Sequence, residues 1–325
     1  MHMNIAIISF WHVHGKSYAD EAMKAGLNIT AVWDENTTRG REWAKKLGCA
    51  FYDDYDRLLG DSSIVGVVIT AATAAHTELI IKAARAGKHI FTEKVLALTL
   101  AECLEIKAAI ERYDVHFTIS FPHMCNPSLR FAKQLSDSGE LGRIHYGRVR
   151  NVHNGASAGR LPAHFYNAAE CGGGAMIDLG AHGMYLLRWL LGKPINCRSL
   201  FTKVTGKPVE DNAVCIMEFA DGAIGVNETG FVSSNCPLTL EIGGDEGALV
   251  YRKDLGVSYA SKKTNGKWIN VTDLPAGLPT PLSLWIKSLK EGVDSPFGID
   301  DAIALTEMME GAYQAAKTPG FVWEN

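Results

Sequence analysis

The sequence predicts an α/β protein with an N-terminal doubly wound parallel sheet, residues 1–121, and an α+β domain with a large, mainly antiparallel open sheet, residues 122–325. Three observations predict this fold. A chain of 325 residues is long for a single hydrophobic core. Apolar runs alternate with helical segments in the first third of the chain, and closely spaced strand patterns fill much of the remainder.

The first domain is expected to contain strands at 4–9, 28–33, 64–70, 89–92 and 115–120. The intervening helices are expected at 18–24, 38–47, 76–86 and 100–112. Gly26, Gly48 and Gly87 end three of these helices, as glycine commonly does. Strands without polar alternation, separated by helices, indicate a parallel sheet covered on both faces, which is the Rossmann arrangement.

The second domain shows a different order of elements. A helix at 127–136, a strand at 144–152 and an amphipathic helix at 177–191 are followed by strand patterns from 196 to about 259. Two helices, at 281–291 and 299–317, follow these strands. This order predicts an antiparallel sheet with helices on one face.

Composition excludes several classes of function. The net charge of −4 and the absence of a basic run argue against a nucleic-acid partner. No apolar run reaches the roughly 18 residues of a membrane span, and no basic segment precedes the first apolar run. The seven cysteines are scattered, without a C-x-x-C pair. We therefore expect a cytoplasmic protein with reduced thiols.

The turn after the first strand is where a dinucleotide fingerprint would lie. Ser9, Phe10, Trp11 and His12 occupy it, and Ser9 and Trp11 stand where two glycines are expected. The helix that follows can still bind phosphate at its N-terminus. Asp34 lies roughly 20 residues beyond the turn, where an acid accepts from ribose hydroxyls and favours NAD over NADP. A helix-capping role for Asp34 is the alternative.

His12 and His14 form an H-x-H pair. No Asp, Glu or Cys lies nearby in the sequence at ligand spacing, so we expect no metal site there. Glu93 and Lys94 directly follow a predicted strand and should lie at the carboxyl edge of the sheet, where ligands bind. Lys94 could orient a substrate hydroxyl, with a solvated loop lysine as the alternative.

A glycine run opens the most informative segment of the second domain. Gly172–Gly174 would let the backbone approach a ligand, and Asp178 and His182 follow at i, i+4 on one helix face. A histidine suits general-base chemistry on an alcohol, and a nearby carboxylate can orient it. A surface hydrogen-bonded pair is the alternative. Further candidate substrate contacts are His153, His164 and Tyr166.

Taken together, these motifs resemble the Gfo/Idh/MocA family, in order and over nearly the whole chain. The E-K-P motif of that family appears as Glu93-Lys94-Val95. Its G-G-G-x-x-x-D-x-G-x-H motif appears intact from Gly172 to Asp178 and His182, and its segment between the domains resembles Gly139-Glu140-Leu141-Gly142.

The resemblance implies an NAD-dependent oxidoreductase that moves a hydride between nicotinamide and a secondary hydroxyl of a sugar, inositol or related polyol. Lys94, Asp178 and His182 would form the catalytic set: His182 as base, Asp178 tuning it and Lys94 positioning the hydroxyl. Thr70 and His76 match a family segment near the cofactor. The resemblance also implies a homodimer or homotetramer formed through the sheet of the second domain.

This chain departs from the family pattern at several positions. Ser9 and Trp11 replace fingerprint glycines, Val95 replaces a proline, and Tyr185 stands where the family often has an acid. Two alternative functions on the same fold therefore stay open. One is a non-catalytic NAD- or sugar-binding protein, and the other is a glycosidase that uses NAD for a transient oxidation.

Overall fold

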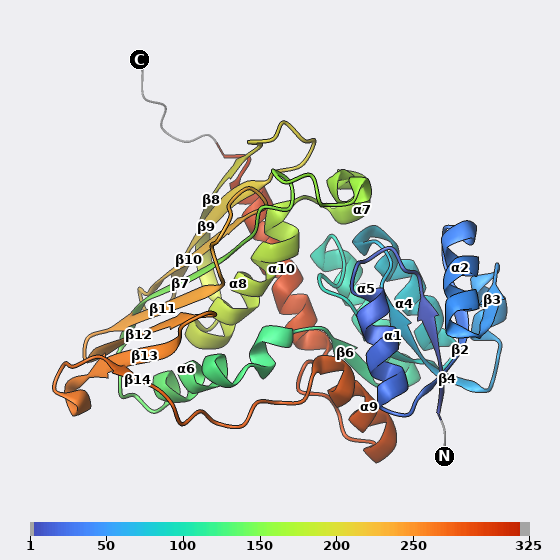
Figure 1. Ribbon diagram of the computed structural model, residues 1–325, viewed down its shortest axis with the longest axis horizontal. Coiled ribbons are helices and arrows are strands. Elements are labelled where there is room, and N and C mark those ends of the chain that lie inside the picture. Colours follow the sequence, from blue (N-terminus) through green and yellow to red (C-terminus); the bar gives the residue numbers. More distant parts are fainter. Residues whose placement is uncertain (1–2, 319–325) are drawn as a thin grey trace. The chain divides into compact units, whose positions relative to one another are not determined.

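The computed structural model describes residues 3–318, which form two compact units (Figure 1). The first unit contains the residues up to 121 together with 279–306, and the second contains 122–278 together with the residues from 307 onward. The sequence-based boundaries assigned 279–306 to the second domain, whereas the contacts of these residues group them with the first unit. The reason is the burial of Trp285 in the core of the first unit, a long-range contact that local sequence patterns do not reveal.

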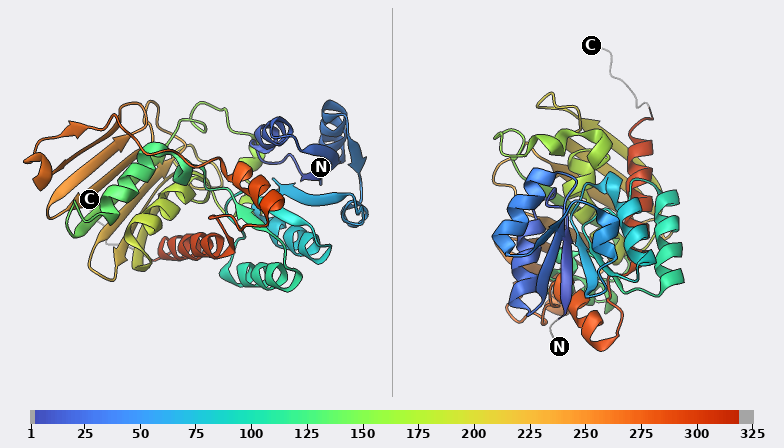
Figure 2. Two further views of the ribbon diagram at one scale, coloured as in Figure 1. Left: turned by 90° about the horizontal axis from the view of Figure 1, so that it is seen from below. Right: turned by 90° about the vertical axis from the view of Figure 1, so that its right-hand side faces the viewer.

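The first unit is built on a six-stranded sheet in the order β3-β2-β1-β4-β5-β6, parallel throughout. The strands are β1 (Asn4–Ile8), β2 (Asn28–Trp33), β3 (Ala50–Tyr52), β4 (Ile64–Ile69), β5 (His89–Thr92) and β6 (Phe117–Ile119). The helices before α9 are α1 (Gly15–Lys24), α2 (Thr37–Leu47), α3 (Tyr55–Leu59), α4 (His76–Arg85) and α5 (Leu100–Tyr113). Helices cover both faces of the sheet (Figure 2, right). This strand order is that of a Rossmann domain and confirms the predicted fold.

Burial and helix caps explain why these segments take their structure. The side chains from Ile5 to Ile8 are completely buried, as expected for a strand covered on both faces. The Asn36 side chain accepts from the backbone N–H of Arg39 at the start of α2, and Gly48 ends that helix in the left-handed conformation. Strand β3 and helix α3 were not predicted, because elements of three and five residues are too short to show periodicity.

Helix α9 (Pro281–Glu291) joins the first unit through Trp285. Trp285 is completely buried in the core formed with residues of β1, β4 and β5, and its ring lies 6.1 Å from the Phe91 ring. A Cβ atom at Gly66 would lie 2.8 Å from the Trp285 ring, so the glycine makes room for it. Burial of this indole places α9 against a sheet formed almost 200 residues earlier in the chain.

The second unit contains an eight-stranded sheet in the order β14-β13-β12-β11-β7-β10-β9-β8. Its strands are β7 (Ile144–Val152), β8 (Pro194–Thr202), β9 (Asn212–Phe219), β10 (Ile224–Gly230), β11 (Thr239–Gly244), β12 (Gly247–Arg252), β13 (Gly256–Ser261) and β14 (Ile269–Asn270). Only the β7–β10 pair is parallel among the pairings of residues 3–318, which confirms the mainly antiparallel sheet.

Helices of the second unit gather on one face of this sheet (Figure 1). They are α6 (Pro127–Asp137), the one-turn α7 (Ala168–Cys171) and α8 (Ala175–Leu191), and α10 (Ile299–Ala315) enters the unit at Glu307. Helix α8 lies close to β10, where the Asn227 side chain donates to the Gly180 carbonyl at 2.8 Å. A Cβ at Gly183 would lie 2.0 Å from the Asn227 amide oxygen. None of the helices within residues 3–318 combines the length and the apolar character that a membrane crossing requires.

Replacing Trp285 by alanine tests the docking of α9. We expect Trp285→Ala to lower the free energy of unfolding by about 3–5 kcal/mol, because it leaves a cavity beside Phe91 and Gly66. Urea denaturation followed by circular dichroism measures this change. Trp268→Ala is the control, since Trp268 is 55% exposed and should change stability by less than about 0.5 kcal/mol. Equal losses in both variants would contradict the packing role of Trp285.

Candidate active site

Backbone hydrogen bonds hold the turn after β1 against the ends of two neighbouring strands. Ser9 has a φ of +70° and takes the left-handed conformation that a glycine would adopt at this fingerprint position. Its backbone N–H donates to the Trp33 carbonyl at 2.6 Å, and its carbonyl accepts from the Thr70 hydroxyl at 2.6 Å. The N–H of His12 donates to the Thr70 carbonyl at 2.9 Å. Ser9 therefore adopts a left-handed conformation without being a glycine, and the turn is fixed to β2 and to Thr70 after β4.

Asp34 is buried at the end of β2 and is held by both backbone and side-chain donors. The Phe10 N–H donates to Asp34 Oδ2 at 2.9 Å and ties the acid to the turn. Arg39 donates from Nε to Oδ2 at 2.9 Å and from Nη2 to Oδ1 at 2.7 Å, a bidentate ion pair. Sequence reasoning missed Arg39, although its spacing of five residues from Asp34 was a visible signal.

Glu93 is a buried carboxylate at the carboxyl edge of β5. Its Oε1 lies 2.7 Å from His14 Nδ1 and 3.7 Å from His12 Nδ1, and it also accepts from the Tyr18 hydroxyl. Its Oε2 accepts from the Lys94 N–H at 3.1 Å. No acid lies near the H-x-H pair along the sequence, but the parallel sheet places the ends of β1 and β5 at the same edge and so brings Glu93 beside the two histidines.

Electrostatics keep Glu93 ionised and Tyr18 protonated. Burial by itself raises the pKa of Glu93, but His12, His14 and Lys94 outweigh it and hold that pKa well below its usual value. Burial, followed by the charge of Glu93, raises the pKa of Tyr18 well above its usual value. The Tyr18 hydroxyl therefore stays a donor, and it also lies 2.8 Å from the Ser120 hydroxyl.

His76 supports the loop that carries Lys94. Its Nδ1 lies 3.1 Å from the Val95 carbonyl and 3.2 Å from the Leu96 carbonyl, and its Nε2 lies 3.1 Å from the Ala71 carbonyl. Both ring nitrogens thus face backbone oxygens. Burial lowers the pKa of His76 although these carbonyls oppose the shift. Lys94 is itself buried, and the Lys94–Val95 peptide bond is cis.

The glycine run before α8 fits closely around two residues that sequence reasoning missed. Glu210 Oε1 accepts from the N–H groups of Gly174 and Met176 at 2.9 and 3.0 Å, and from the Tyr313 hydroxyl at 2.6 Å. A Cβ at Gly173 would lie 1.9 Å from the Tyr313 hydroxyl oxygen, and one at Gly174 would lie 2.0 Å from the Glu210 carbonyl oxygen. These two glycines therefore allow a buried carboxylate to cap the helix.

Helix α8 carries Asp178 and His182, and it also supplies the partner of the histidine. His182 is buried, and its Nδ1 lies 2.9 Å from the Tyr185 hydroxyl. That hydroxyl also accepts from the His123 N–H at 3.3 Å. The His123 ring meets the His182 ring edge to face, with centroids 4.6 Å apart. Tyr185 thus contacts the histidine where the family often has an acid.

Phe231 brings together two of the predicted substrate contacts. The His153 ring stacks on Phe231 at 5.1 Å, and Tyr166 packs against the small cluster that contains Phe231. Burial lowers the pKa of His153, although the charge of Asp178 opposes the shift. His164 lies in the same 3-10 helix as Tyr166, Ala163–Tyr166.

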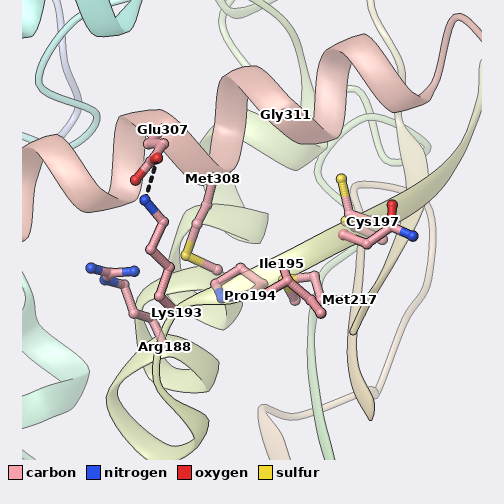
Figure 3. Close-up of a pocket in the computed structure, with 11 residues that line it drawn as sticks. Arg188, Lys193, Pro194, Ile195, Cys197, Met217, Glu307, Met308 and Gly311 are labelled. Carbon is pink, nitrogen blue, oxygen red and sulfur yellow. Dashed lines mark hydrogen bonds and ion pairs between the residues drawn. The ribbon is translucent and has the colours of Figure 1, made fainter. Parts of the chain in front are cut away.

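A separate pocket of about 150 Å³ lies in the second unit between the end of α8, β8 and α10 (Figure 3). Its lining includes Arg188, Cys197 and Gly311, and an ion pair joins Lys193 Nζ to Glu307 Oε1 at 2.6 Å. None of the predicted site residues lines it. Its volume is below the roughly 300–1,000 Å³ of typical small-molecule sites, so we do not assign the chemistry to it.

The first unit is therefore a dinucleotide-binding fold, and the second carries a helix with a buried histidine. Two protein-family models match the chain. The model described as "Oxidoreductase family, NAD-binding Rossmann fold" matches residues 3–121, and the GFO/IDH/MocA C-terminal domain matches residues 129–250. The chain belongs to the Gfo/Idh/MocA oxidoreductase family. This confirms the family and the NAD-binding domain predicted from the sequence.

Similar proteins include several named dehydrogenases. The chain is 30% identical to scyllo-inositol 2-dehydrogenase (NAD(+)) of Bacillus subtilis, over 69% of this chain and 66% of that protein. It is 26% identical to myo-inositol 2-dehydrogenase of Thermotoga maritima, over 66% and 63%. The matched part thus spans about two thirds or slightly less of these relatives.

Solved structures show the same fold. GenD2 from gentamicin A biosynthesis in complex with NAD matches with a TM-score of 0.82 and 25% identity, over 97% of this chain and 94% of that one. Levoglucosan dehydrogenase in complex with NADH and L-sorbose matches with a TM-score of 0.84 and 22% identity, over 97% of each chain.

The lowered pKa of His76 predicts a pH dependence of stability. The unfolded chain protonates His76 at a higher pH than the folded chain does, because burial disfavours the charged ring. The stability that neutral His76 contributes is therefore fully present above its ordinary pKa of about 6.5 and is lost as the pH falls through the folded pKa. We expect His76→Gln to flatten the decline of the unfolding free energy between about pH 7 and pH 5. Urea denaturation across that range measures the slope.

His145→Gln is the matched control for this experiment. His145 is 51% exposed in the side chain, and its replacement should leave the slope unchanged. A slope in His76→Gln equal to that of the unsubstituted protein would show that burial of His76 does not contribute to the pH dependence.

Proposed function

We propose that this protein is an NAD-dependent dehydrogenase that acts on a secondary hydroxyl of a sugar, an inositol or a related polyol. The observation that carries the proposal is the buried His182 with its Tyr185 partner, on a helix that also bears Asp178. The same chain contains an NAD-binding domain with Lys94 at the carboxyl edge of its sheet. The named inositol and levoglucosan dehydrogenases among the similar proteins support polyhydroxylated substrates.

His182 is the proposed general base. Oxidation of an alcohol removes the hydroxyl proton together with a hydride from carbon, so the site needs a proton acceptor. The Tyr185 oxygen has two lone pairs and can accept from both His123 N–H and His182 Nδ1–H. With Nδ1 protonated in this way, Nε2 keeps the lone pair that takes the substrate proton.

Lys94 and Asp178 are proposed to assist this proton transfer. The Lys94 ammonium would position the substrate hydroxyl as a donor. The Asp178 carboxylate would stabilise the histidine cation, as its charge already does for His153. His153, His164 and Tyr166 are proposed to contact the remaining hydroxyl groups, since histidine and tyrosine both donate and accept.

The residues around the β1 turn fit a bound dinucleotide. Ser9 keeps the backbone conformation of the first fingerprint glycine, and we propose that Ser9, Phe10, Trp11 and His12 contact the pyrophosphate region. Thr70, His76, Glu93 and Lys94, together with Asp34, complete the proposed cofactor-binding set. Bound NAD+ supplies the hydride acceptor.

We propose that Asp34 favours NAD over NADP. Its carboxylate lies at the end of β2, where it would accept from the ribose hydroxyls and repel a 2′-phosphate. Arg39 now forms two hydrogen bonds with that carboxylate. The ribose must therefore share the acid with Arg39 or displace it.

Steady-state oxidation of a sugar and polyol panel tests the proposed function, with NADH formation followed by absorbance. We expect Lys94→Ala and His182→Ala each to lower kcat/KM by about 10²–10⁴-fold, because each removes a group that handles the reacting hydroxyl. The dissociation constant of His182→Ala for NAD(H), measured by calorimetry, should change little, whereas Lys94→Ala also removes a proposed cofactor contact. Activity with NAD+ should exceed that with NADP+, and Asp34→Ala should narrow the difference.

His145→Ala is the control that should retain full activity, because His145 is exposed on β7. NAD(H) binding without turnover of any panel member would replace the proposal by a non-catalytic binding protein. Product release from glycosides without net NADH would instead identify a glycosidase that uses NAD transiently.

We propose that a second copy of this chain covers the helix-free face of the eight-stranded sheet. Outward side chains there include Leu200, Ile216 and Ile224, which are 66%, 46% and 46% exposed. The register places β8, β9 and β10 side by side, so these side chains form one patch. Covering such a patch is a common basis for symmetric dimers, and a second interface would give a tetramer.

Sedimentation velocity tests this assembly. We expect the protein to sediment as a dimer or tetramer, and Leu200→Glu/Ile216→Glu to shift it towards the monomer, with at least about a tenfold weaker association. Leu104→Glu is the control, since Leu104 is 53% exposed on α5 in the first unit. A monomeric unsubstituted protein would refute the proposal.

We also propose that the protein works in the cytoplasm. None of the seven cysteines, all of which lie within residues 3–318, is assigned to a disulfide. Cysteines outside disulfides are typical of proteins kept in a reducing compartment. Fractionation of the cells that produce the protein would test this location.

A further inference from the structure

Two histidines and a carboxylate meet in the first unit, and two of these three residues, His12 and Glu93, also belong to the proposed cofactor-binding set. The nitrogen atoms of His12 and His14 and a carboxylate oxygen of Glu93 all lie within 4.8 Å of one another. This cluster is the single group of three or more metal-ligating side chains within residues 3–318. We propose that His12, His14 and Glu93 bind a divalent transition-metal ion of the Zn²⁺ or Co²⁺ type.

The distances in the cluster match those in a coordination sphere. Tetrahedral Zn²⁺ with bonds of about 2.0–2.1 Å holds its ligand atoms roughly 3.3 Å apart. Glu93 Oε1 lies 2.7 Å from His14 Nδ1 and 3.7 Å from His12 Nδ1, on either side of that value. A cation would take the place of the proton now shared between His14 and Glu93.

Charge and burial also favour a cation at this point. Glu93 is 2% exposed, and a carboxylate is costly to bury in its ionised form without a compensating charge. Imidazoles are the commonest nitrogen ligands of Zn²⁺ and Co²⁺, and they bind in the neutral form. His14 is 48% exposed, so it offers a route by which an ion can reach the buried acid from solvent.

Neighbouring groups hold the carboxylate in place. The Tyr18 hydroxyl donates to Oε1, and the Lys94 N–H donates to Oε2 at 3.1 Å. Outer hydrogen bonds of this kind orient metal ligands and contribute to affinity. His12 is fixed as well, because its backbone N–H donates to the Thr70 carbonyl at 2.9 Å. The Glu93 carboxylate is thus held in place before an ion arrives, whereas His12 Nδ1 would exchange the His14 backbone N–H, which it accepts at 3.3 Å, for the ion.

Three protein ligands leave at least one coordination position for water or for an anionic oxygen. Two imidazoles and one carboxylate with an open position are the ligand set of many divalent transition-metal sites. The ligands come from the β1 turn and the end of β5, which a parallel sheet brings to one edge. Metal binding can be measured without NAD or substrate, so its failure and the failure of the proposed dehydrogenase activity are distinguishable.

Titration of the chelator-treated, full-length protein with Zn²⁺ by calorimetry tests the proposal. Absorption spectra of the Co²⁺ form report the ligand types. We expect one equivalent to bind, with d–d bands of a nitrogen and oxygen site and without a thiolate charge-transfer band. Tyr18→Phe should weaken binding by about 10–100-fold, because Glu93 loses an orienting hydrogen bond. His12→Gln, His14→Gln and Glu93→Gln should each weaken it further.

Two control variants complete this experiment. His116→Gln replaces a partly exposed histidine of the same unit outside the cluster, and Cys197→Ser removes a half-buried thiol of the second unit. Both should keep full affinity, and circular dichroism should show that every variant is folded. The proposal is overturned if no saturable binding occurs. Binding that survives His12→Gln and His14→Gln, or that falls in Cys197→Ser, would also overturn it.

Discussion

A buried negative charge organises the ligand edge of the first unit. Glu93 is ionised and almost fully buried, so each of its oxygens must accept hydrogen bonds. Its donors come from the β1 turn and α1, through His14 and Tyr18, and from the backbone of Lys94. One carboxylate therefore fixes the position of the turn that we assign to the dinucleotide and of the lysine that we assign to the substrate. The same charge makes the cluster suitable for a cation.

A second buried carboxylate has the corresponding role at the start of α8. Glu210 accepts from two backbone N–H groups of the helix and from Tyr313, and Gly173 and Gly174 leave room for these contacts. The glycine run that first suggests a ligand thus has a structural explanation within the second unit. Its consequence is still functional, because the anchored helix fixes the direction in which Asp178 and His182 project.

Local patterns in the sequence predicted the helices and strands that are long or strongly apolar. The β1 strand, the helix predicted at 177–191 and the alternation of the second sheet are examples, and the three family motifs were visible as short strings, one of them with Val95 in place of proline. Short elements such as β3 were not predicted, because three residues show no measurable periodicity. The packing of α9 against the first unit was not predicted either, because it depends on Trp285 filling the space above Gly66.

The sequence by itself determined the fold class, through a residue order and periodicity that the chain carries without reference to its folded form. The resemblance of its short motifs to a known family indicated the family, the NAD-binding domain and the candidate catalytic residues Lys94, Asp178 and His182. Only the tertiary structure decided which side chains meet. Glu93 reaches His14 across 79 positions, and Tyr313 reaches Glu210 across 103. Burial of these side chains, and the requirement that buried polar groups form hydrogen bonds, decide which residues pair. Both effects act between segments that are far apart in the sequence and share no local pattern.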